Sequence, residues 1–245
     1  MSFESELLVS VRSWDEVESL LDTGVSIIDL KEPNFGSLGP VSAGLVLQVA
    51  ERLIDRPQIK LSIAMGELRD LDVELSSFPP FLAIDYAKVG LSKCGLLPKK
   101  DWQSRWMQWR DSLPISCQPV LVAFADHFSA DAPHLDDILE FALQMRCTML
   151  IDTWLKNHQN LLDHLSLERL AETSEEMRKA GLQLALAGSL NDQSIVKIQQ
   201  RMKPNIFAVR GAACIQNSRT GSVDPLSVCR LQNLMGSRKK RGAKV

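Results

Sequence analysis

Short apolar runs recur along the chain, and between them apolar residues return with the spacing of a helix. Eight runs are typical of β-strands: 7–11, 26–31, 59–65, 84–91, 119–125, 148–152, 183–187 and 206–209. Their nearly continuous apolar character indicates burial on both faces, as in parallel sheets covered by helices. The alternation of strand and helix over 245 residues therefore predicts an α/β protein, a closed (β/α)8 TIM barrel rather than an open doubly wound sheet.

A stripe of tryptophans marks one of the predicted helices, 101–113. Trp102, Trp106 and Trp109 follow one another at spacings of four and three, which places them on one face of that helix. Such stripes usually form core, so we expect this face to pack on the barrel or at a subunit contact. The helical pattern of the third unit, 68–75, is short, so this unit is one of the weakest parts of the prediction.

The length and composition predict one domain, 1–235, that is a single barrel. A polar and basic tail, 236–245, follows the last helical pattern, and we expect it to be disordered. The formal net charge of -2 provides no global attraction to nucleic acid or to an anionic membrane. No apolar run approaches the roughly 20 residues that a membrane-spanning helix needs.

The N-terminus, 1–6, is acidic and does not resemble a signal peptide, so we expect a cytoplasmic protein. The cysteines are scattered without a close pair, and the histidines show no metal-ligand spacing. We therefore expect reduced thiols and no bound metal, and the imine chemistry expected of Lys31 needs no organic cofactor either. The cysteines are Cys94, Cys117, Cys147, Cys214 and Cys229.

Lys31 is the most informative candidate for chemistry, because it ends an apolar run and leads through Pro33 into a loop with Gly36 and Gly39. Side chains alternate along a strand, so Asp29 and Lys31 project to the same side. A lysine beside other cations and a carboxylate loses its proton at modest cost and can attack a carbonyl. The plain alternative is a solvated lysine at a strand end.

The carboxyl ends of all strands in a (β/α)8 barrel share one face, so charged residues at those ends converge. Strand ends two, four, five and six carry lysines and carboxylates, and His127 follows one of them. This common position predicts a catalytic mouth on one face of the barrel. The predicted catalytic residues are Lys31, Lys88, Lys156, Asp29, Asp152 and Asp126.

Glycines follow the last two strands, in Gly188-Ser189 and in Arg210-Gly211-Ala212. The loops at these positions in barrels frequently bind phosphate through backbone N–H groups. Arg210 would add a bidentate contact. The sequence thus predicts a small-molecule phosphorylated substrate as the partner.

Several segments together resemble the (5-formylfuran-3-yl)methyl phosphate synthase family, (β/α)8 lyases that make the furan precursor of methanofuran. These segments are 7–10, 29–33, 36–39, 61–67, 88–91, 187–190 and 209–214. The resemblance covers nearly the whole chain and implies an enzyme, a carbon–oxygen lyase acting on phosphates. It implies that two triose phosphates, with glyceraldehyde 3-phosphate as the starting material, are joined into a furan aldehyde phosphate with loss of phosphate and water.

The resemblance also implies roles for individual residues. Lys31 is implied to be the Schiff-base lysine, with Asp29 and Lys88 beside it, while Asp152 and Lys156 handle protons. An imine on lysine acidifies the neighbouring carbon, permits carbon–carbon bonding through an enamine, and assists loss of a β leaving group. Lys88 close to Lys31 would disfavour two adjacent ammonium charges and help to keep one amine neutral.

The chain departs from the family pattern in two places. Phe124 stands where members often carry tyrosine, and Asn157-His158 follow Lys156 where an acidic residue and a glycine are usual. A second hypothesis is therefore another Schiff-base aldolase or isomerase of phosphorylated sugars. A third is a non-catalytic phosphate-metabolite sensor or RNA-associated protein that uses the basic tail, although no nucleic-acid motif accompanies that charge. The oligomeric state stays open, with room for a homo-oligomer.

Overall fold

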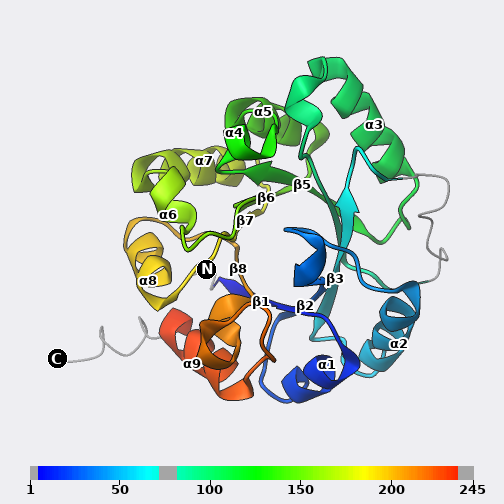
Figure 1. The fold of residues 1–245 in the computed structure, drawn as a ribbon, viewed down its shortest axis with the longest axis vertical. Helices are drawn as coiled ribbons and strands as arrows, with labels where there is room; N and C mark the ends of the chain where they lie inside the picture. The colour runs from blue at the N-terminus through cyan, green and yellow to red at the C-terminus, as the bar shows by residue number, and fades with distance from the viewer. Residues whose placement is uncertain (1–4, 72–81, 237–245) are drawn as a thin grey trace.

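The computed structural model describes residues 5–71 and 82–236. Eight parallel strands form a closed barrel in which each strand pairs with the next and β8 returns to β1 (Figure 1). The predicted (β/α)8 barrel and all eight predicted strands are therefore confirmed, with boundaries that differ by one to two residues at most ends. The strands are β1 Glu6–Val11, β2 Ile27–Leu30, β3 Lys60–Glu67, β4 Tyr86–Gly90, β5 Gln118–Phe124, β6 Thr148–Asp152, β7 Leu184–Leu186 and β8 Ile206–Val209.

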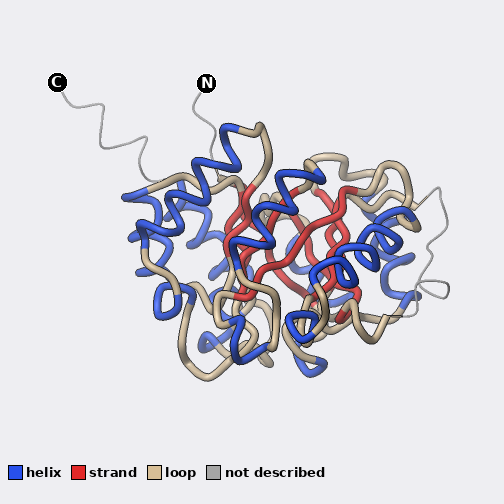
Figure 2. The backbone as a smooth tube through the Cα atoms, turned by 90° about the horizontal axis from the view of Figure 1, so that it is seen from above, coloured by secondary structure: helices blue, strands red, loops and turns tan. Residues whose placement is uncertain are grey.

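Helices form a ring outside the strands (Figure 1), and Figure 2 shows helices flanking the strands in a view turned by 90°. The α-helices are α1 Trp14–Leu20, α2 Ala43–Leu53, α3 Lys99–Asp111, α4 His127–Ala130, α5 Leu135–Met145, α6 Leu161–His164, α7 Leu167–Lys179, α8 Asp192–Arg201 and α9 Pro225–Gly236. The short 3-10 turns are η1 Pro33–Phe35, η2 Cys94–Leu96, η3 Gly211–Ala213 and η4 Ile215–Asn217. The helical pattern predicted at 68–75 lies half outside the described residues, and its described part, 68–71, is not helical.

Local hydrogen bonds begin the helices where the sequence supplies small polar residues. The Ser13 side chain accepts from the Glu16 N–H at the start of α1. Asn191 accepts from the Ser194 N–H at 2.9 Å, and the Ser194 hydroxyl accepts from the Asn191 N–H at 2.8 Å. These caps satisfy backbone donors that the first helical turn leaves unpaired, so each helix starts directly after its loop.

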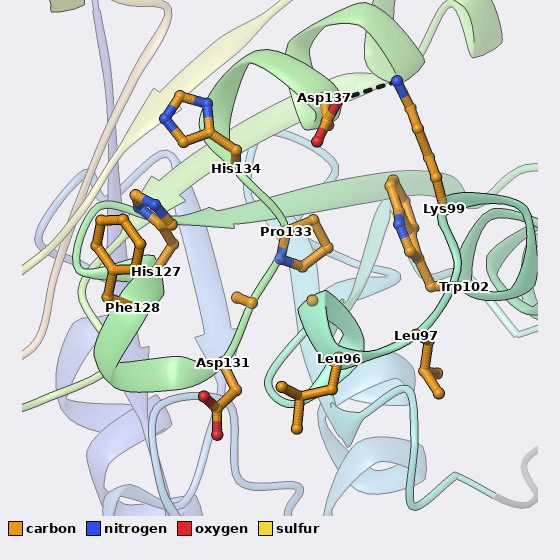
Figure 3. Close-up of a pocket in the computed structure, with 12 residues that line it drawn as sticks. Leu96, Leu97, Lys99, Trp102, His127, Phe128, Asp131, Pro133, His134 and Asp137 are labelled. Atoms are coloured by element: carbon orange, nitrogen blue, oxygen red, sulfur yellow. Dashed lines mark hydrogen bonds and ion pairs between the residues drawn. The ribbon is translucent and has the colours of Figure 1, made fainter.

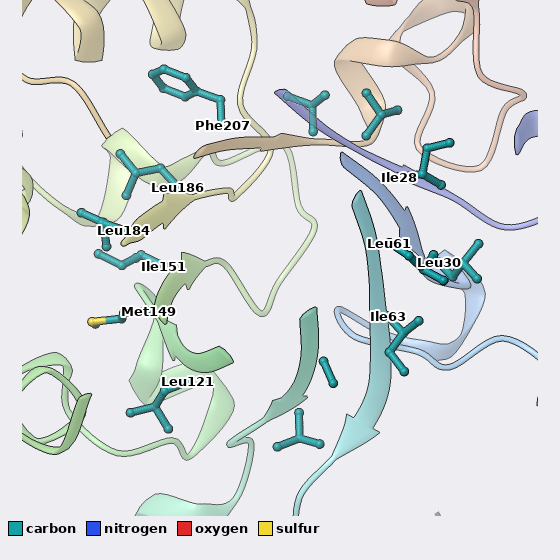
Figure 4. Close-up of a cluster of buried hydrophobic side chains, with 14 of the residues drawn as sticks. Ile28, Leu30, Leu61, Ile63, Leu121, Met149, Ile151, Leu184, Leu186 and Phe207 are labelled. Carbon is teal, nitrogen blue, oxygen red and sulfur yellow. The ribbon is translucent and has the colours of Figure 1, made fainter. Parts of the chain in front are cut away.

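Apolar side chains fill two layers separated by the strands. On β2, Ile28 and Leu30 point outward into the larger layer between strands and helices, part of which Figure 4 draws. Ile27 points inward and packs with Phe124 and other residues in the smaller layer inside the barrel. The alternation along β2 predicted from the sequence is thus confirmed, and it sends Asp29 inward.

The tryptophan stripe packs within the protein. Trp102, Trp106 and Trp109 of α3 are at most 2% exposed. The rings of Trp102 and Trp106 stand edge-on to Phe141 of α5, with centroids 5.2 and 5.5 Å away. The predicted packing on the barrel is therefore confirmed.

The last helix, α9, ends at Gly236, and the rest of the predicted basic tail, 237–245, lies outside the described residues. Within the described part of the chain, no helix has both the length and the apolar character that crossing a membrane requires.

The loop that follows β2 crosses the carboxyl end of the barrel, where η1 lies over the middle in Figure 1. The Glu32 N–H donates to the Gly39 carbonyl at 2.9 Å and closes the loop on itself. The Ser37 hydroxyl donates to the Thr153 carbonyl at 3.1 Å, which joins the loop to the far side of the barrel after β6. Leu38 is buried in the inner apolar layer. This loop therefore covers the barrel interior at the carboxyl end of the strands.

Replacing Gly39 by alanine should destabilise the protein. A Cβ at this position would overlap the Glu32 carbonyl oxygen and lie 2.6 Å from the Phe35 Cβ. Such overpacking against backbone costs roughly 1–3 kcal/mol, so we expect a loss of that size in the free energy of unfolding, measured by chemical denaturation. Gly44→Ala is the matched control, because no atom lies within 4 Å of its added Cβ. Equal stability of the two variants would contradict the closed loop.

Candidate active site

Strands β1 to β4 each contribute one polar side chain to a buried layer inside the barrel: Ser10, Asp29, Ser62 and Lys88. Asp29 stands opposite both serines in the register of the sheet. Its carboxylate accepts from the Ser10 and Ser62 hydroxyls, each at 2.8 Å, and it forms an ion pair with Lys88. Lys88 also donates to the Ser62 hydroxyl at 2.9 Å. These four buried side chains thus provide one another with hydrogen-bond partners in place of water.

Burial and charge act against each other in this layer. Asp29 is 1% exposed and Lys88 is 3% exposed. Burial acts to raise the pKa of Asp29, but the ammonium groups of Lys88 and Lys31 lower it below its usual value. Burial lowers the pKa of Lys88, Asp29 opposes that change, and the charge of Lys31 adds to it. Asp29 therefore stays ionised, and Lys88 gives up its proton more readily than a lysine in water.

A second ion pair follows β6. Lys156 donates to Asp152 at 2.9 Å and to the Thr153 carbonyl at 2.5 Å. Burial acts to raise the pKa of Asp152, but Lys156 and Lys31 lower it to about 2. Burial lowers the pKa of Lys156 against the attraction of Asp152, and Lys31 and Arg219 lower it further. This second lysine is likewise held by an ionised carboxylate.

Lys31 lies between the two pairs. Its charge acts on both carboxylates and on both paired lysines. It is partly exposed, and no hydrogen bond or ion pair joins its ammonium group to another described residue. The structure thus brings together Lys31, Lys88, Lys156, Asp29 and Asp152, and Lys31 is the lysine of this group that no carboxylate holds.

Asp126 faces a loop rather than these five residues. Its two carboxylate oxygens accept from the backbone N–H groups of Trp154, at 2.6 Å, and Leu155, at 2.8 Å. The carboxylate therefore holds the turn that carries Lys156. His127, the next residue, points elsewhere: it lines a separate cavity of about 370 Å³.

That cavity lies beside the barrel mouth, between η2 and the α4–α5 segment (Figure 3). It is lined mainly by apolar and aromatic groups such as Trp102 and Phe128, with His127, His134 and Lys99 around them. None of the five charged residues of the mouth lines it. The described residues hold no cluster of histidine, cysteine and carboxylate side chains that would bind a metal ion.

Backbone amides line the mouth after the last two strands. Gly188 and Ser189 have positive φ angles of 90° and 49°. A Cβ on Gly188 would lie 2.9 Å from the Thr153 Cγ2, so this position favours glycine. Among the described residues, the N–H groups of Gly188, Ser189, Gly211 and Ala212 have no hydrogen-bond acceptor. These are the amides that the sequence analysis assigned to phosphate.

The Arg210 side chain is fully engaged inside the protein. It forms a buried bidentate ion pair with Glu16 of α1, at 2.6 and 2.9 Å. Its remaining N–H groups donate to the carbonyls of Ser10, Arg219 and Gly221. This arrangement leaves no side-chain N–H of Arg210 for the expected phosphate. The sequence could not reveal this, because Glu16 lies at the opposite end of the chain.

Glu67 is a mouth residue that the sequence analysis did not select. The pairing of β3 with β4 shifts register between Ala64 and Glu67, and such a bulge re-aims the side chain. The Glu67 carboxylate accepts from the Ser92 N–H at 3.0 Å and lies where a side chain on Gly90 would stand. Burial raises the pKa of Glu67 to about 7, the Ser92 N–H opposes this, and the charges of Asp70 and Asp152 add to it. The position of this carboxylate at the end of a strand was the sequence feature that could have identified Glu67 as a site residue.

Arg219 is the second residue missed. Its Nη2 donates to the carbonyls of Pro33 and Gly36, each at 3.2 Å, which joins the loop after β8 to the loop after β2. It follows no strand directly, so the strand-end rule could not find it.

The two departures from the family pattern lie in different surroundings. Phe124 is buried inside the barrel, edge-on to Trp154 with ring centroids 5.4 Å apart. His158 is exposed and has a positive φ angle of 73°. Phe124 therefore acts in packing, in a place where a phenol would add a hydroxyl group.

Comparison with known proteins gives a consistent family. The family model described as 4-HFC-P synthase matches residues 7–232. The (5-formylfuran-3-yl)methyl phosphate synthase of Methanocaldococcus jannaschii is 30% identical over 238 residues, covering 93% of this chain and 98% of the relative. The protein of the same name from Methanococcus aeolicus is 29% identical over 218 residues, covering 87% and 92%.

Solved structures support the fold alone, because their sequences are distant. Phosphoribosyl anthranilate isomerase from Thermotoga maritima has a TM-score of 0.61 at 11% identity, covering 95% of this chain and 99% of its own. A 3-hexulose-6-phosphate synthase has a TM-score of 0.55 at 12% identity, covering 92% and 98%.

Glu67 should make the stability of the protein depend on pH. Its pKa is raised in the folded state, so the folded protein holds the proton longer, and stability falls as pH rises from about 4.5 to about 7. Glu67→Gln removes this penalty. We expect the variant to gain up to about 3 kcal/mol relative to the wild type between pH 5 and pH 8, measured by urea denaturation at both pH values.

The control is Glu18→Gln, a change at an exposed position of α1. A gain for Glu67→Gln that is the same at pH 5 and pH 8 would contradict the burial of this carboxylate.

Proposed function

This chain belongs to the 4-HFC-P synthase family of enzymes, and we propose that it joins two molecules of glyceraldehyde 3-phosphate into (5-formylfuran-3-yl)methyl phosphate. Phosphate and water are lost in the reaction, which serves methanofuran biosynthesis. The observation that carries the proposal is the position of Lys31, an amine without a carboxylate partner among the described residues, between two lysine–carboxylate pairs. The relatives that carry this synthase name support the choice of product.

Lys31 acts as the nucleophile. Its neutral amine adds to the aldehyde of a triose phosphate, and loss of water leaves an imine. The imine withdraws electrons from the adjacent carbon, so that carbon loses a proton and becomes an enamine. The phosphate ester of glyceraldehyde 3-phosphate is on the carbon β to the imine, and the enamine electrons can expel it. Loss of phosphate leaves an α,β-unsaturated imine, whose end carbon accepts the α-carbon of a second triose phosphate and forms the new carbon–carbon bond. Ring closure with loss of water, followed by hydrolysis of the imine, then gives the furan aldehyde phosphate.

The two ion pairs move the protons. Lys88 is buried and its pKa is lowered, so it can accept and return a proton beside Lys31 while Asp29 stays ionised. Lys156 donates a proton to the departing oxygen. The Asp152 carboxylate beside it then favours return of a proton to this lysine. Asp126 serves this step indirectly, because it holds the turn that presents Lys156.

The phosphate groups bind at the carboxyl end of β7 and β8. The backbone N–H groups of Gly188, Ser189, Gly211 and Ala212 have no acceptor within residues 5–71 and 82–236 and can donate there. Arg210 supports this site through Glu16 and the carbonyls of the loop rather than by touching phosphate itself.

Borohydride reduction should trap the enzyme on Lys31. With glyceraldehyde 3-phosphate and borohydride, we expect one lysine per chain to gain the mass of a reduced triose adduct, and peptide mapping should place it at Lys31. Lys31→Arg keeps the charge but cannot form the imine at neutral pH, so it should abolish trapping and lower product formation by at least about 1000-fold, the scale expected for loss of a covalent nucleophile.

Lys197→Arg, at an exposed position of α8, is the matched control and should react as the wild type does. A trapped lysine other than Lys31, or furan formation by Lys31→Arg, would reject the mechanism. Mass spectrometry of the product separates the proposal from its rival: an open-chain adduct in place of the furan indicates another Schiff-base aldolase.

A further inference from the structure

We infer that the Arg219 guanidinium binds the phosphate group of the triose phosphate and thereby selects phosphorylated over unphosphorylated substrates. This inference rests on the proposed function, because it assigns the residue that recognises the proposed substrate class.

Arg219 lies between the two parts of the site. Its backbone packs beside the amides after β8: a Cβ on Gly211 would lie 3.9 Å from the Arg219 nitrogen. Its guanidinium reaches the other way, to the carbonyls of Pro33 and Gly36 in the loop that begins with Lys31. Arg219 therefore stands in the same loop as the Gly211 and Ala212 amides, and its guanidinium lies against the loop that begins with Lys31.

The guanidinium has donors to spare. Only its Nη2 is engaged within the described part of the chain, so the N–H groups of Nε and Nη1 have no acceptor there. No carboxylate in that part forms an ion pair with Arg219, whereas Arg210 has every donor occupied. The N–H groups of Nε and Nη1 of Arg219 lie on different edges of the guanidinium, so each can donate one charge-assisted hydrogen bond to an oxygen of a phosphate monoester.

The charges around Arg219 favour an anion. Lys88 and Lys156 are each paired with a carboxylate, while Arg219 and Lys31 have no such partner among the described residues. Arg219 is close enough to Lys156 to lower the pKa of that lysine, so its positive charge acts within the mouth. The guanidinium of Arg219 is charged whether or not Lys31 is free, and no carboxylate of the described residues lies within ion-pair distance of it.

The loop that presents Arg219 is rigidly tied. Arg210 donates to the Arg219 carbonyl at 2.9 Å and to the Gly221 carbonyl at 2.8 Å, and Glu16 holds Arg210 in place. A buried, bidentate pair of this kind fixes the backbone on both sides of Arg219. Binding a ligand therefore costs the Arg219 loop little conformational entropy.

The test measures binding of sn-glycerol 3-phosphate, which carries the phosphate but has no carbonyl to form an imine. Calorimetric titration of the full-length wild type should give binding that Arg219→Gln weakens by roughly 10- to 100-fold, the loss expected for a charged hydrogen-bonding group. Trapping of unphosphorylated glyceraldehyde on Lys31 should change by less than about 2-fold, because that aldehyde has no phosphate to bind.

Two further variants sharpen the test. Arg219→Lys keeps the charge but lacks the separate N–H donors of the guanidinium, so it should recover part of the affinity. Arg201→Gln removes one exposed arginine at the end of α8, far along the chain from the loop, and should leave glycerol 3-phosphate binding unchanged.

Each outcome decides the inference. Unchanged glycerol 3-phosphate binding by Arg219→Gln overturns it. Equal losses in glycerol 3-phosphate binding and in glyceraldehyde trapping also overturn it, because Arg219 would then serve only to tie the two loops together. If binding depends on Arg219 but no lysine is trapped in the wild type, the phosphate contact stands and the Schiff-base function falls. If Lys31 is trapped and Arg219 does not affect phosphate binding, the Schiff-base function stands and the phosphate contact of Arg219 falls.

Discussion

A carboxylate buried inside the barrel is the interaction on which the rest of this site depends. Taking the Asp29 charge out of water costs several kcal/mol unless donors replace the lost solvent. Two hydroxyls and one ammonium group supply those donors, from the strands on both sides and from β4. Because the serines are register partners of Asp29, the pairing of β1, β2 and β3 must be correct for the charge to be satisfied. The strand pairing that builds the barrel therefore also places the charged groups of the mouth.

The loops above this layer are tied together by side chains rather than by their own sequence patterns. Ser37 joins the loop after β2 to β6, and Arg219 joins the same loop to the segment after β8. The buried Arg210–Glu16 pair then ties that segment to α1. Segments from both ends of the chain thus meet around Lys31. Asp29, Lys88 and Asp152 are buried beneath these loops, which strengthens the charge interactions among them.

Several features could be predicted because they follow from short-range rules. Apolar runs indicated all eight strands, and the alternation along β2 correctly sent Asp29 inward. The common position of strand ends brought Lys31 to Lys88 and Lys156. The same rule treated Asp126 as an equal member of the group, although its carboxylate caps two backbone amides. Position at a strand end does not say which donor a carboxylate will find.

The sequence by itself determined the order of strands and helices and the strand ends at which charged residues stand, because those depend on side-chain periodicity and on the geometry of a parallel barrel. Only the tertiary structure decided which charged side chains are paired with other groups of the protein. Arg210 and Arg219 both lie in the last loop, yet Arg210 is paired with Glu16, whereas Arg219 has donors without an acceptor in the described part of the chain. A bulge in β3 likewise decided that Glu67 enters the mouth. Partners that lie far apart in the chain, and shifts of one residue in register, leave no periodic trace in a sequence.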